Sequence, residues 1–213
     1  MTTTVVVIGT GTDVGKTWVS AQVLRSLRAE GHTVSARKPA QSFEPADRTT
    51  DAHVLGAATG EDPHAVCPVH RWYHTPMAPP MAAEAIGRPA FLIADLVDEM
   101  EWPVPSPALA LIETAGGLRS PHAADGDALT LIEALQPDLV LVVADAGLGT
   151  INLVRLTLDA LDQGSHVATP VVFLNRHDPD DDLHRRNRAW LERNVRAEVF
   201  TATPALTARL RPR

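Results

Sequence analysis

Residues 9–17 read GTGTDVGKT, between a β-branched run at 4–8 and a stretch at 16–29 whose apolar residues recur at helical spacing. A strand, a glycine-rich turn and a helix in that order are the setting of a phosphate-binding loop. Glycines let backbone N–H groups face phosphate oxygens, and the helix start adds the positive end of its dipole. Thr10 stands at the first glycine position of the usual G-x4-G-K-S/T motif, so the spacing from Gly9 is one residue longer. We therefore expect a nucleotide-binding turn before the first helix.

Polar side chains near this turn predict phosphate and metal binding. Lys16 is placed to reach the β- and γ-phosphates of a nucleotide, and the Thr17 hydroxyl to ligate Mg²⁺. An enzyme with a phosphate-binding loop of this kind also needs a metal-binding carboxylate at the end of a buried strand. Glu113 meets that need, because it ends the apolar run at 108–113. Gly116 follows closely and would let the backbone approach the γ-phosphate.

The rest of the chain alternates between apolar runs and segments of helical periodicity. Continuous apolar runs are typical of strands buried on both faces of a parallel sheet. Further strands are expected at 33–37, 108–113, 138–144 and 169–174. Helices are expected at 51–58, 80–87, 92–100, 127–135, 152–163 and 182–195. This alternation predicts an α/β fold with a mostly parallel central sheet, helices on both faces, and a single P-loop domain over 1–213.

Composition limits the class of protein. The chain has 213 residues, 45% of them apolar, with a formal net charge of −7 and one cysteine. A single cysteine favours a reducing compartment, and no apolar run approaches the roughly 20 residues that span a bilayer. The acidic balance argues against nucleic acid as a partner. We therefore expect a cytoplasmic protein that acts on small molecules, without a membrane or nucleic-acid partner.

Further motifs follow one another as they do in dethiobiotin synthetases, and the chain resembles that family over residues 4–175. The glycine-rich turn is similar to the family's own variant, G-T-x-T-D/E-V-G-K-T, including the extra residue. The other matching segments are Lys38-Pro39 with Ser42, Asp51, Met77-Ala78-Pro79-Pro80 followed by Ala82-Ala83-Glu84, Glu113-Thr114-Ala115-Gly116-Gly117, Gly147-Leu148-Gly149-Thr150-Ile151-Asn152, and Asn175.

The resemblance implies an ATP- and Mg²⁺-dependent cyclo-ligase of biotin biosynthesis. Such an enzyme carboxylates 7,8-diaminononanoate with CO₂ and closes the ureido ring of dethiobiotin. A carbamate forms first, attacks the γ-phosphate to give a carbamic-phosphoric anhydride, and is then closed by the second amine. This chemistry needs no covalent protein nucleophile, so catalysis rests on positioning and on charge stabilisation.

The resemblance also implies a role for each matching residue. The catalytic residues would be Lys16, Lys38, Thr12 and Ser42. The nucleotide would contact Gly11, Thr12, Asp13, Val14, Gly15, Lys16, Thr17, Glu113, Gly116 and Asn175. Mg²⁺ would be held by the hard oxygen ligands of Thr17, Asp51 and Glu113. The diamine carboxylate substrate would contact Ser42, Pro79, Gly149, Thr150, Ile151 and Asn152. The family takes that last segment from the partner subunit, which implies a homodimer with active sites at the interface.

Departures from the family pattern leave alternatives open. Thr114 and Phe43 stand where the family usually has glycine, and the match is poor after Asn175. The first two substitutions favour an alternative in which the same scaffold acts on a different amine substrate. A second alternative is a switch ATPase similar to ParA and MinD, but Gly11 stands where those proteins carry a lysine.

Overall fold

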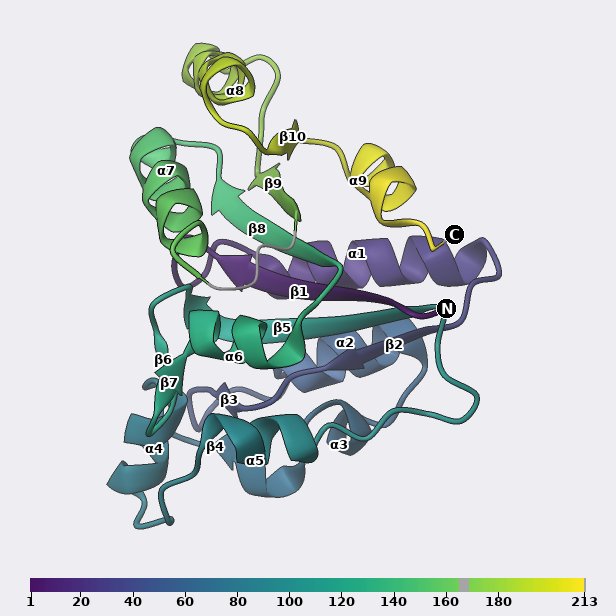
Figure 1. The fold of residues 1–213 in the computed structure, drawn as a ribbon, viewed down its shortest axis with the longest axis vertical. Coiled ribbons are helices and arrows are strands. Elements are labelled where there is room, and N and C mark those ends of the chain that lie inside the picture. The colour runs from purple at the N-terminus through teal and green to yellow at the C-terminus, as the bar shows by residue number, and fades with distance from the viewer. Residues whose placement is uncertain (165–168, 213) are drawn as a thin grey trace.

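The computed structural model describes residues 1–164 and 169–212. Its centre is a six-stranded sheet in the order β10-β9-β8-β1-β5-β2, in which every neighbouring pair is parallel (Figure 1). The strands are β1 (Thr3–Gly9), β2 (Val34–Arg37), β5 (Leu109–Gly117), β8 (Leu139–Asp145), β9 (Thr169–Asn175) and β10 (Glu198–Phe200). Parallel strands need crossover connections, and here helices supply them on both faces.

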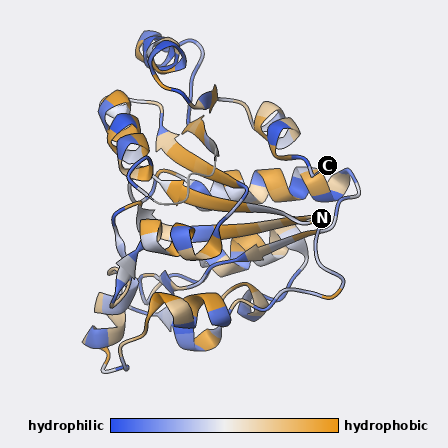
Figure 2. Cartoon of the chain, viewed as in Figure 1, coloured by the Kyte–Doolittle hydropathy of each residue, from blue (hydrophilic) through white to orange (hydrophobic). Residues whose placement is uncertain are grey.

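Alternate residues of the central strands face different helical layers. Val5 and Val7 of β1 pack with α1 (Lys16–Ala29), α2 (Asp51–Thr59) and α9 (Thr203–Leu210). Val6 and Ile8 of the same strand pack with α6 (Ala128–Leu135), α7 (Thr150–Leu161) and α8 (Asp182–Asn194). Burial on both sides explains the unbroken apolar runs of these strands, which Figure 2 shows as an apolar centre between more polar helices.

A smaller third layer lies beside the β2 edge. It contains α4 (Pro79–Ala85), α5 (Ile93–Asp98) and two short ladders. One ladder pairs β3 (Gln41–Ser42) with β4 (Trp72–Tyr73), and the other pairs β6 (Pro121–Ala123) with β7 (Gly126–Asp127). The turn α3 (Pro63–Val66) and the 3₁₀ turn η1 (Val69–Arg71) lead into β4. This layer has its own apolar cluster around Tyr73, Phe91 and Leu96.

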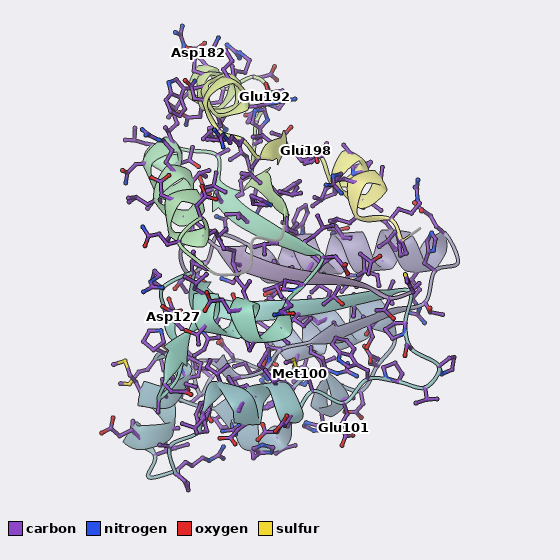
Figure 3. The ribbon with its side chains drawn as sticks, in the orientation of Figure 1. Met100, Glu101, Asp127, Asp182, Glu192 and Glu198 are labelled. Carbon is purple, nitrogen blue, oxygen red and sulfur yellow. The ribbon has the colours of Figure 1, made fainter. Side chains whose placement is uncertain are left out.

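Helix ends follow local chemistry. Asp127 caps α6 by accepting N–H groups of Leu129 and Thr130, and Figure 3 shows its side chain at the start of that helix. Asp181 caps α8 through the N–H of His184. Asp182 and Glu192, also labelled in Figure 3, form ion pairs with arginines along the exposed face of α8.

The predicted α/β fold is confirmed, with differences at particular elements. The five expected strands at 4–8, 33–37, 108–113, 138–144 and 169–174 are present, with ends shifted by a few residues. β5 continues past residue 113 to Gly117, so Glu113 lies inside its strand rather than at its end. The helix expected at 152–163 begins two residues earlier at Thr150. The pattern did not indicate β10 or α9 beyond residue 195, nor the short ladders of the third layer. Two- and three-residue strands carry too little periodicity to be recognised in a sequence.

Within residues 1–164 and 169–212, no helix combines the length and the apolar character that crossing a bilayer requires.

Candidate active site

The carboxyl ends of the central strands converge on the glycine-rich turn. This turn joins β1 to α1, and its last glycine, Gly15, is the N-cap of α1 with a φ of 91°. A Cβ at Gly15 would lie 2.1 Å from Nδ2 of Asn175, which follows from the close approach of the β9 end. Both the left-handed backbone and the lack of space therefore require glycine here.

Lys16 lies folded back across the turn. Its Nζ donates to the carbonyl of Gly116 at 2.9 Å and to that of Gly11 at 3.3 Å. Burial, together with repulsion from the Lys38 ammonium, lowers the pKa of Lys16 from its usual 10.5 to about 8. The side chain therefore joins the turn to the end of β5 and places a weakly held proton beside the expected phosphate position.

Two strands and a helix contribute to a cluster of charges. Lys38 follows β2, Asp51 begins α2, and Glu113 lies in β5. Nζ of Lys38 lies 2.6 Å from Oδ2 of Asp51 and 3.0 Å from Oε1 of Glu113. Its remaining proton is directed at the carbonyl of Thr114, 3.3 Å away. All three donors of the ammonium are thus satisfied.

The Thr17 hydroxyl completes this cluster. Its Oγ1 lies 2.7 Å from Oδ1 of Asp51 and 2.7 Å from Oε1 of Glu113, so its single proton serves one carboxylate at a time. Ser20, one helical turn on, donates to the other oxygen of Glu113 at 2.8 Å. Two carboxylates, each within hydrogen-bond range of the same hydroxyl, form a hard oxygen set that suits Mg²⁺.

The electrostatics of the cluster favour the charged forms of Lys38 and Asp51. Burial opposes the charge on Lys38, but the two carboxylates outweigh it and raise the pKa of Lys38 above its usual value. Burial likewise opposes the charge on Asp51, but the Lys38 ammonium and the hydrogen bonds lower the pKa of Asp51.

A histidine braces the loop that follows β5. The N–H of Ala115 donates to Nε2 of His122 at 3.0 Å, so the ring proton lies on Nδ1 and is directed at the carbonyl of Ser120, 2.9 Å away. Burial lowers the pKa of His122 from 6.5 to about 4, which keeps the ring neutral. Gly116, whose carbonyl receives Lys16, is held between these two contacts.

A cavity of about 820 Å³ opens in front of this cluster. The expected site residues along it are Thr12, Asp13, Gly15, Lys16, Thr17, Lys38, Ser42, Asp51, Pro79 and Gly116. Ser42 donates to the carbonyl of Met77 at 2.6 Å, which ties the segment after Lys38 to the loop before α4. The structure thus joins segments from β2, α2, α4 and β5 into one cleft.

The two substitutions in the family pattern have different surroundings. The Thr114 hydroxyl donates to the carbonyl of Val7 at 3.1 Å, inside the sheet and away from the cavity. Phe43 lines the cavity, and its ring packs edge-on against His74 at 4.6 Å between centroids. Only Phe43 therefore alters the cleft surface directly.

A second cavity, of about 600 Å³, lies at the ends of β9 and β10. It shares Gly15 and Arg176 with the first, so the two are neighbours across the glycine-rich turn. Asn175 lines it, and its Nδ2 donates to the carbonyl of Val14 at 2.9 Å. The acceptor atom of this side-chain amide, Oδ1, is not used in that hydrogen bond. Residues 201–204, before and in α9, also line this cavity, and no sequence pattern had pointed to them.

The α7 start lies apart from this cleft. Among the described residues, Gly149, Thr150, Ile151 and Asn152 line neither cavity. Gly149 is the N-cap of α7 with a φ of 91°, so the helix start itself has the expected form.

Sequence patterns did not point to several residues of the site. Gln41 lies in the cavity wall, and its Oε1 accepts the N–H of Ala52, next to Asp51. Arg176, with a φ of 56°, donates to the Asp13 carbonyl and to Asp145, both at 2.9 Å. Its position directly after Asn175 at a strand end is the signal that could have revealed it. His122 offered none.

The sequence contains two lysines, Lys16 and Lys38, and both lie in this cleft. Every other cationic side chain apart from histidine is an arginine.

Comparison with known proteins gives consistent results along the chain. Residues 3–212 match a family model described as an AAA domain. A protein of Anaeromyxobacter dehalogenans (strain 2CP-C), named ATP-dependent dethiobiotin synthetase BioD, is 40% identical over 83% of this chain and 78% of its own length. Proteins of the same name from Haloferax mediterranei (32% identical, 95% of this chain and 84% of its own length) and Rhodococcus jostii (35%, 96% and 87%) also match.

Solved structures share the fold at low sequence identity. A ParA family ATPase from Chlorobium tepidum TLS superposes with a TM-score of 0.56 at 12% identity, over 98% of this chain and 88% of that chain. Chloroplast FtsY from Physcomitrella patens gives 0.51 at 14% identity, over 99% and 65%. These likenesses concern the P-loop NTPase fold alone. Identity with the curated relatives over most of both chains shows that this chain belongs to the ATP-dependent dethiobiotin synthetase family.

Proposed function

We propose that this protein is an ATP-dependent dethiobiotin synthetase, a ligase of biotin biosynthesis that carboxylates 7,8-diaminononanoate with CO₂ and closes the ureido ring. The observation that carries the proposal is a cleft lined by Lys16, Lys38, Thr17 and Asp51. The buried Glu113 lies directly behind it, in contact with Lys38 and Thr17. Relatives that cover most of this chain bear the name of that activity.

The nucleotide would lie along the two neighbouring cavities. Its phosphates would contact the backbone N–H groups of residues 11–17 and the Lys16 ammonium, and its base would lie near Asn175. Mg²⁺ would be held by Thr17, Asp51 and Glu113, and it would supply charge compensation to the β- and γ-phosphates. The fit rests on oxygen ligands that the fold already places 2.7 Å from a common hydroxyl.

The chemistry proceeds through charge rather than through a covalent protein intermediate. One amine nitrogen attacks CO₂ and loses a proton, which gives a carbamate. A carbamate oxygen attacks the γ-phosphorus, and ADP leaves with the electrons of the broken P–O bond. The second amine then attacks the anhydride carbon, loses a proton and expels phosphate as the ring closes.

The chain's own groups would stabilise the charges in these steps. Lys38, held by Asp51 and Glu113, would offset the charge of the carbamate and the transferring phosphoryl group, together with Lys16. Thr12 and Ser42 would hydrogen-bond the carbamate oxygens. Pro79 would contact the aliphatic chain of the substrate from the α4 side of the cleft.

We also propose a homodimer in which the start of α7 reaches the partner's cleft. Gly149 to Asn152 line neither of the two cavities, although the N–H groups in the first turn of α7 would suit a substrate carboxylate. Leucines 148, 153 and 156 expose apolar surface beside this helix start. A surface of this kind is typical of a subunit contact.

The first test is phosphate release with ATP, Mg²⁺ and bicarbonate, with and without 7,8-diaminononanoate, followed by mass spectrometry of the product. Diamine-dependent release and the mass of dethiobiotin would support the proposal. Phosphate release that does not depend on the diamine, in a protein that still binds the nucleotide, would contradict the substrate assignment.

One observation supports a second candidate, an enzyme of the same scaffold that acts on another amine substrate. Phe43 lines the cleft where the family usually has glycine, so it reduces the space available to the substrate. Turnover by wild type and Phe43→Gly on diamines of different chain length would discriminate. A preference that moves towards 7,8-diaminononanoate only in Phe43→Gly would favour this candidate.

A further inference from the structure

Trp18 is the tryptophan whose position neither packing nor the proposed chemistry accounts for. It follows Thr17 in the first turn of α1 and is 51% exposed. On α1 it belongs to the outer stripe with Gln22 and Arg25, while Val19, Val23 and Leu24 face the core. A large aromatic ring gains little by standing among polar residues on the outside of a helix.

The other three tryptophans have clear partners. The Trp72 Nε1 donates to the carbonyl of Cys67 at 2.8 Å. Trp102 lies under the Arg37 guanidinium, 4.7 Å from its ring centre, and Trp190 lies 5.7 Å from the Arg155 guanidinium. Within residues 1–164 and 169–212, Trp18 forms no hydrogen bond through its indole, no ring contact and no cation–π contact.

Trp18 borders the second cavity. The same cavity has the Asn175 amide at one side and residues 201–204 at another, and it adjoins the phosphate end through Gly15 and Arg176. Its volume of about 600 Å³ lies within the usual range of small-molecule sites. An aromatic face and an amide acceptor at one cavity are the groups that bind a heteroaromatic base by stacking and by hydrogen bonding.

We propose that Trp18 stacks on the base of the bound nucleotide and supplies much of the base's contribution to affinity. The inference rests on the proposed use of ATP and goes beyond it by assigning the base-binding surface to a residue outside the P-loop motif. Any base offers a π-face, so stacking by Trp18 secures the base without selecting it. Selection then falls to the acceptor of Asn175, the Oδ1 left free by the bond to Val14.

A comparison of the affinities for MgADP and for magnesium tripolyphosphate separates the contribution of the base from that of the phosphates. Trp18→Leu removes the base–aromatic stack and is therefore expected to raise the Kd for ADP by about tenfold. The Kd for tripolyphosphate should change by less than about twofold, because that probe lacks a base. Trp18→Phe keeps a smaller ring and should fall between wild type and Trp18→Leu.

Indole fluorescence gives an independent readout. ADP should quench the wild-type emission, and Trp18→Phe should abolish that quenching. The matched control is Trp190→Phe, which also removes one indole but on α8, away from both cavities, and should keep the quenching.

The proposal is overturned if ADP binds Trp18→Leu as tightly as it binds wild type, or if the substitution weakens the binding of ADP and of tripolyphosphate equally. It is also overturned if ADP still quenches the fluorescence of Trp18→Phe. Neither probe involves the diamine. A wild-type protein that binds ADP through Trp18 but releases no phosphate with the diamine would therefore contradict the proposed substrate and leave this inference standing.

Discussion

At the scale of single residues, the two lysines have opposite electrostatic surroundings. Lys38 lies between two carboxylates, which raise its pKa, whereas Lys16 has backbone carbonyls as partners and a lysine nearby. The cleft therefore contains one fixed cation and one that titrates near pH 8. The difference follows from the partners that each ammonium finds, since both side chains are buried.

The lowered pKa of Lys16 predicts selective chemical modification. At pH 8 about half of Lys16 is the free amine, because its pKa is about 8, whereas Lys38 stays protonated. An amine-acylating reagent at pH 8 should modify Lys16 and the chain's α-amino group, and leave Lys38 largely intact. Peptide mass mapping would measure this, and MgATP should protect Lys16 but not the α-amino group. Equal labelling of both lysines would contradict the assignment.

The burial of Lys38 predicts that its loss has two consequences. Lys38→Met should abolish turnover and leave Asp51 and Glu113 without their cation, which typically costs about 3–5 kcal/mol. Thermal unfolding would show the lower Tm, and added Mg²⁺ should restore part of it, since the divalent ion supplies the missing charge. Lys16→Met, which breaks hydrogen bonds to carbonyls only, is the matched control and should not share this Mg²⁺ response. An unchanged Tm in Lys38→Met would rule out the ion cluster.

At the scale of elements, the site is made mainly from the carboxyl ends of strands, with Glu113 inside β5 as the exception. β2 leads to Lys38, β5 carries Glu113 and continues to Gly117, and β9 ends at Asn175. In open α/β sheets ligands bind at the carboxyl ends of the strands, where the chain changes direction across the sheet. Here β1 has β8 on one side and β5 on the other, and its turn faces the cleft.

We expect the protein to lose stability in mild acid because of His122, which lies in β6 and braces the loop after β5. His122 has a folded pKa of about 4 against an ordinary value of 6.5, so between these values the unfolded chain binds more protons. The contribution of neutral His122 is fully present above pH 6.5 and is lost as the pH falls towards 4. The free energy of unfolding should drop by about 3 kcal/mol across that window through this group.

Urea unfolding at pH 7, 5.5 and 4.5 would measure the effect. His122→Gln provides the control, because its amide has both an acceptor and a donor but does not titrate in this range. The pH dependence should be weaker in that variant. An identical pH dependence in wild type and His122→Gln would show that the acid sensitivity has another source.

At the scale of the whole molecule, α7 exposes leucines on the side that faces away from the core. Leu153 is 44% exposed and Leu156 58%, while Val154 of the same helix is fully buried. One side of α7 therefore anchors the helix to the sheet and the other presents apolar surface outward. This division supports the proposed dimer, in which the second side would meet another subunit.

The proposed dimer predicts a coupled loss of assembly and activity. Leu156→Asp places a charge on the apolar side of α7, so it should shift the protein to monomers and reduce diamine-dependent turnover by tenfold or more. Light scattering after size exclusion would give the molar mass. Val104→Asp, in an exposed loop outside α7, should leave both properties unchanged. A wild-type monomer with full activity would contradict the shared site.

Much of this molecule could be predicted because local chemistry carried the signal. The turn at 9–17, the apolar strands and the place of Glu113 directly after an apolar run each follow from residues close together in the sequence. A glycine-rich turn before a helix has one dominant use, and a continuous apolar run of this length among helices has few places except a buried strand. These features determined the fold class, the phosphate-binding loop and the family resemblance.

Only the tertiary structure decided how distant segments meet. The Lys38 side chain reaches Asp51 and Glu113 because β2 and β5 are neighbours in the sheet, an order that local periodicity does not encode. The base-side cavity depends on α9 returning beside α1, and no motif marked residues 201–204. Such contacts arise from long-range packing, in which many weak apolar interactions choose the arrangement together. The sequence by itself determined the reacting groups, whereas the fold decided their distances, their charges and the surface left for the nucleotide base.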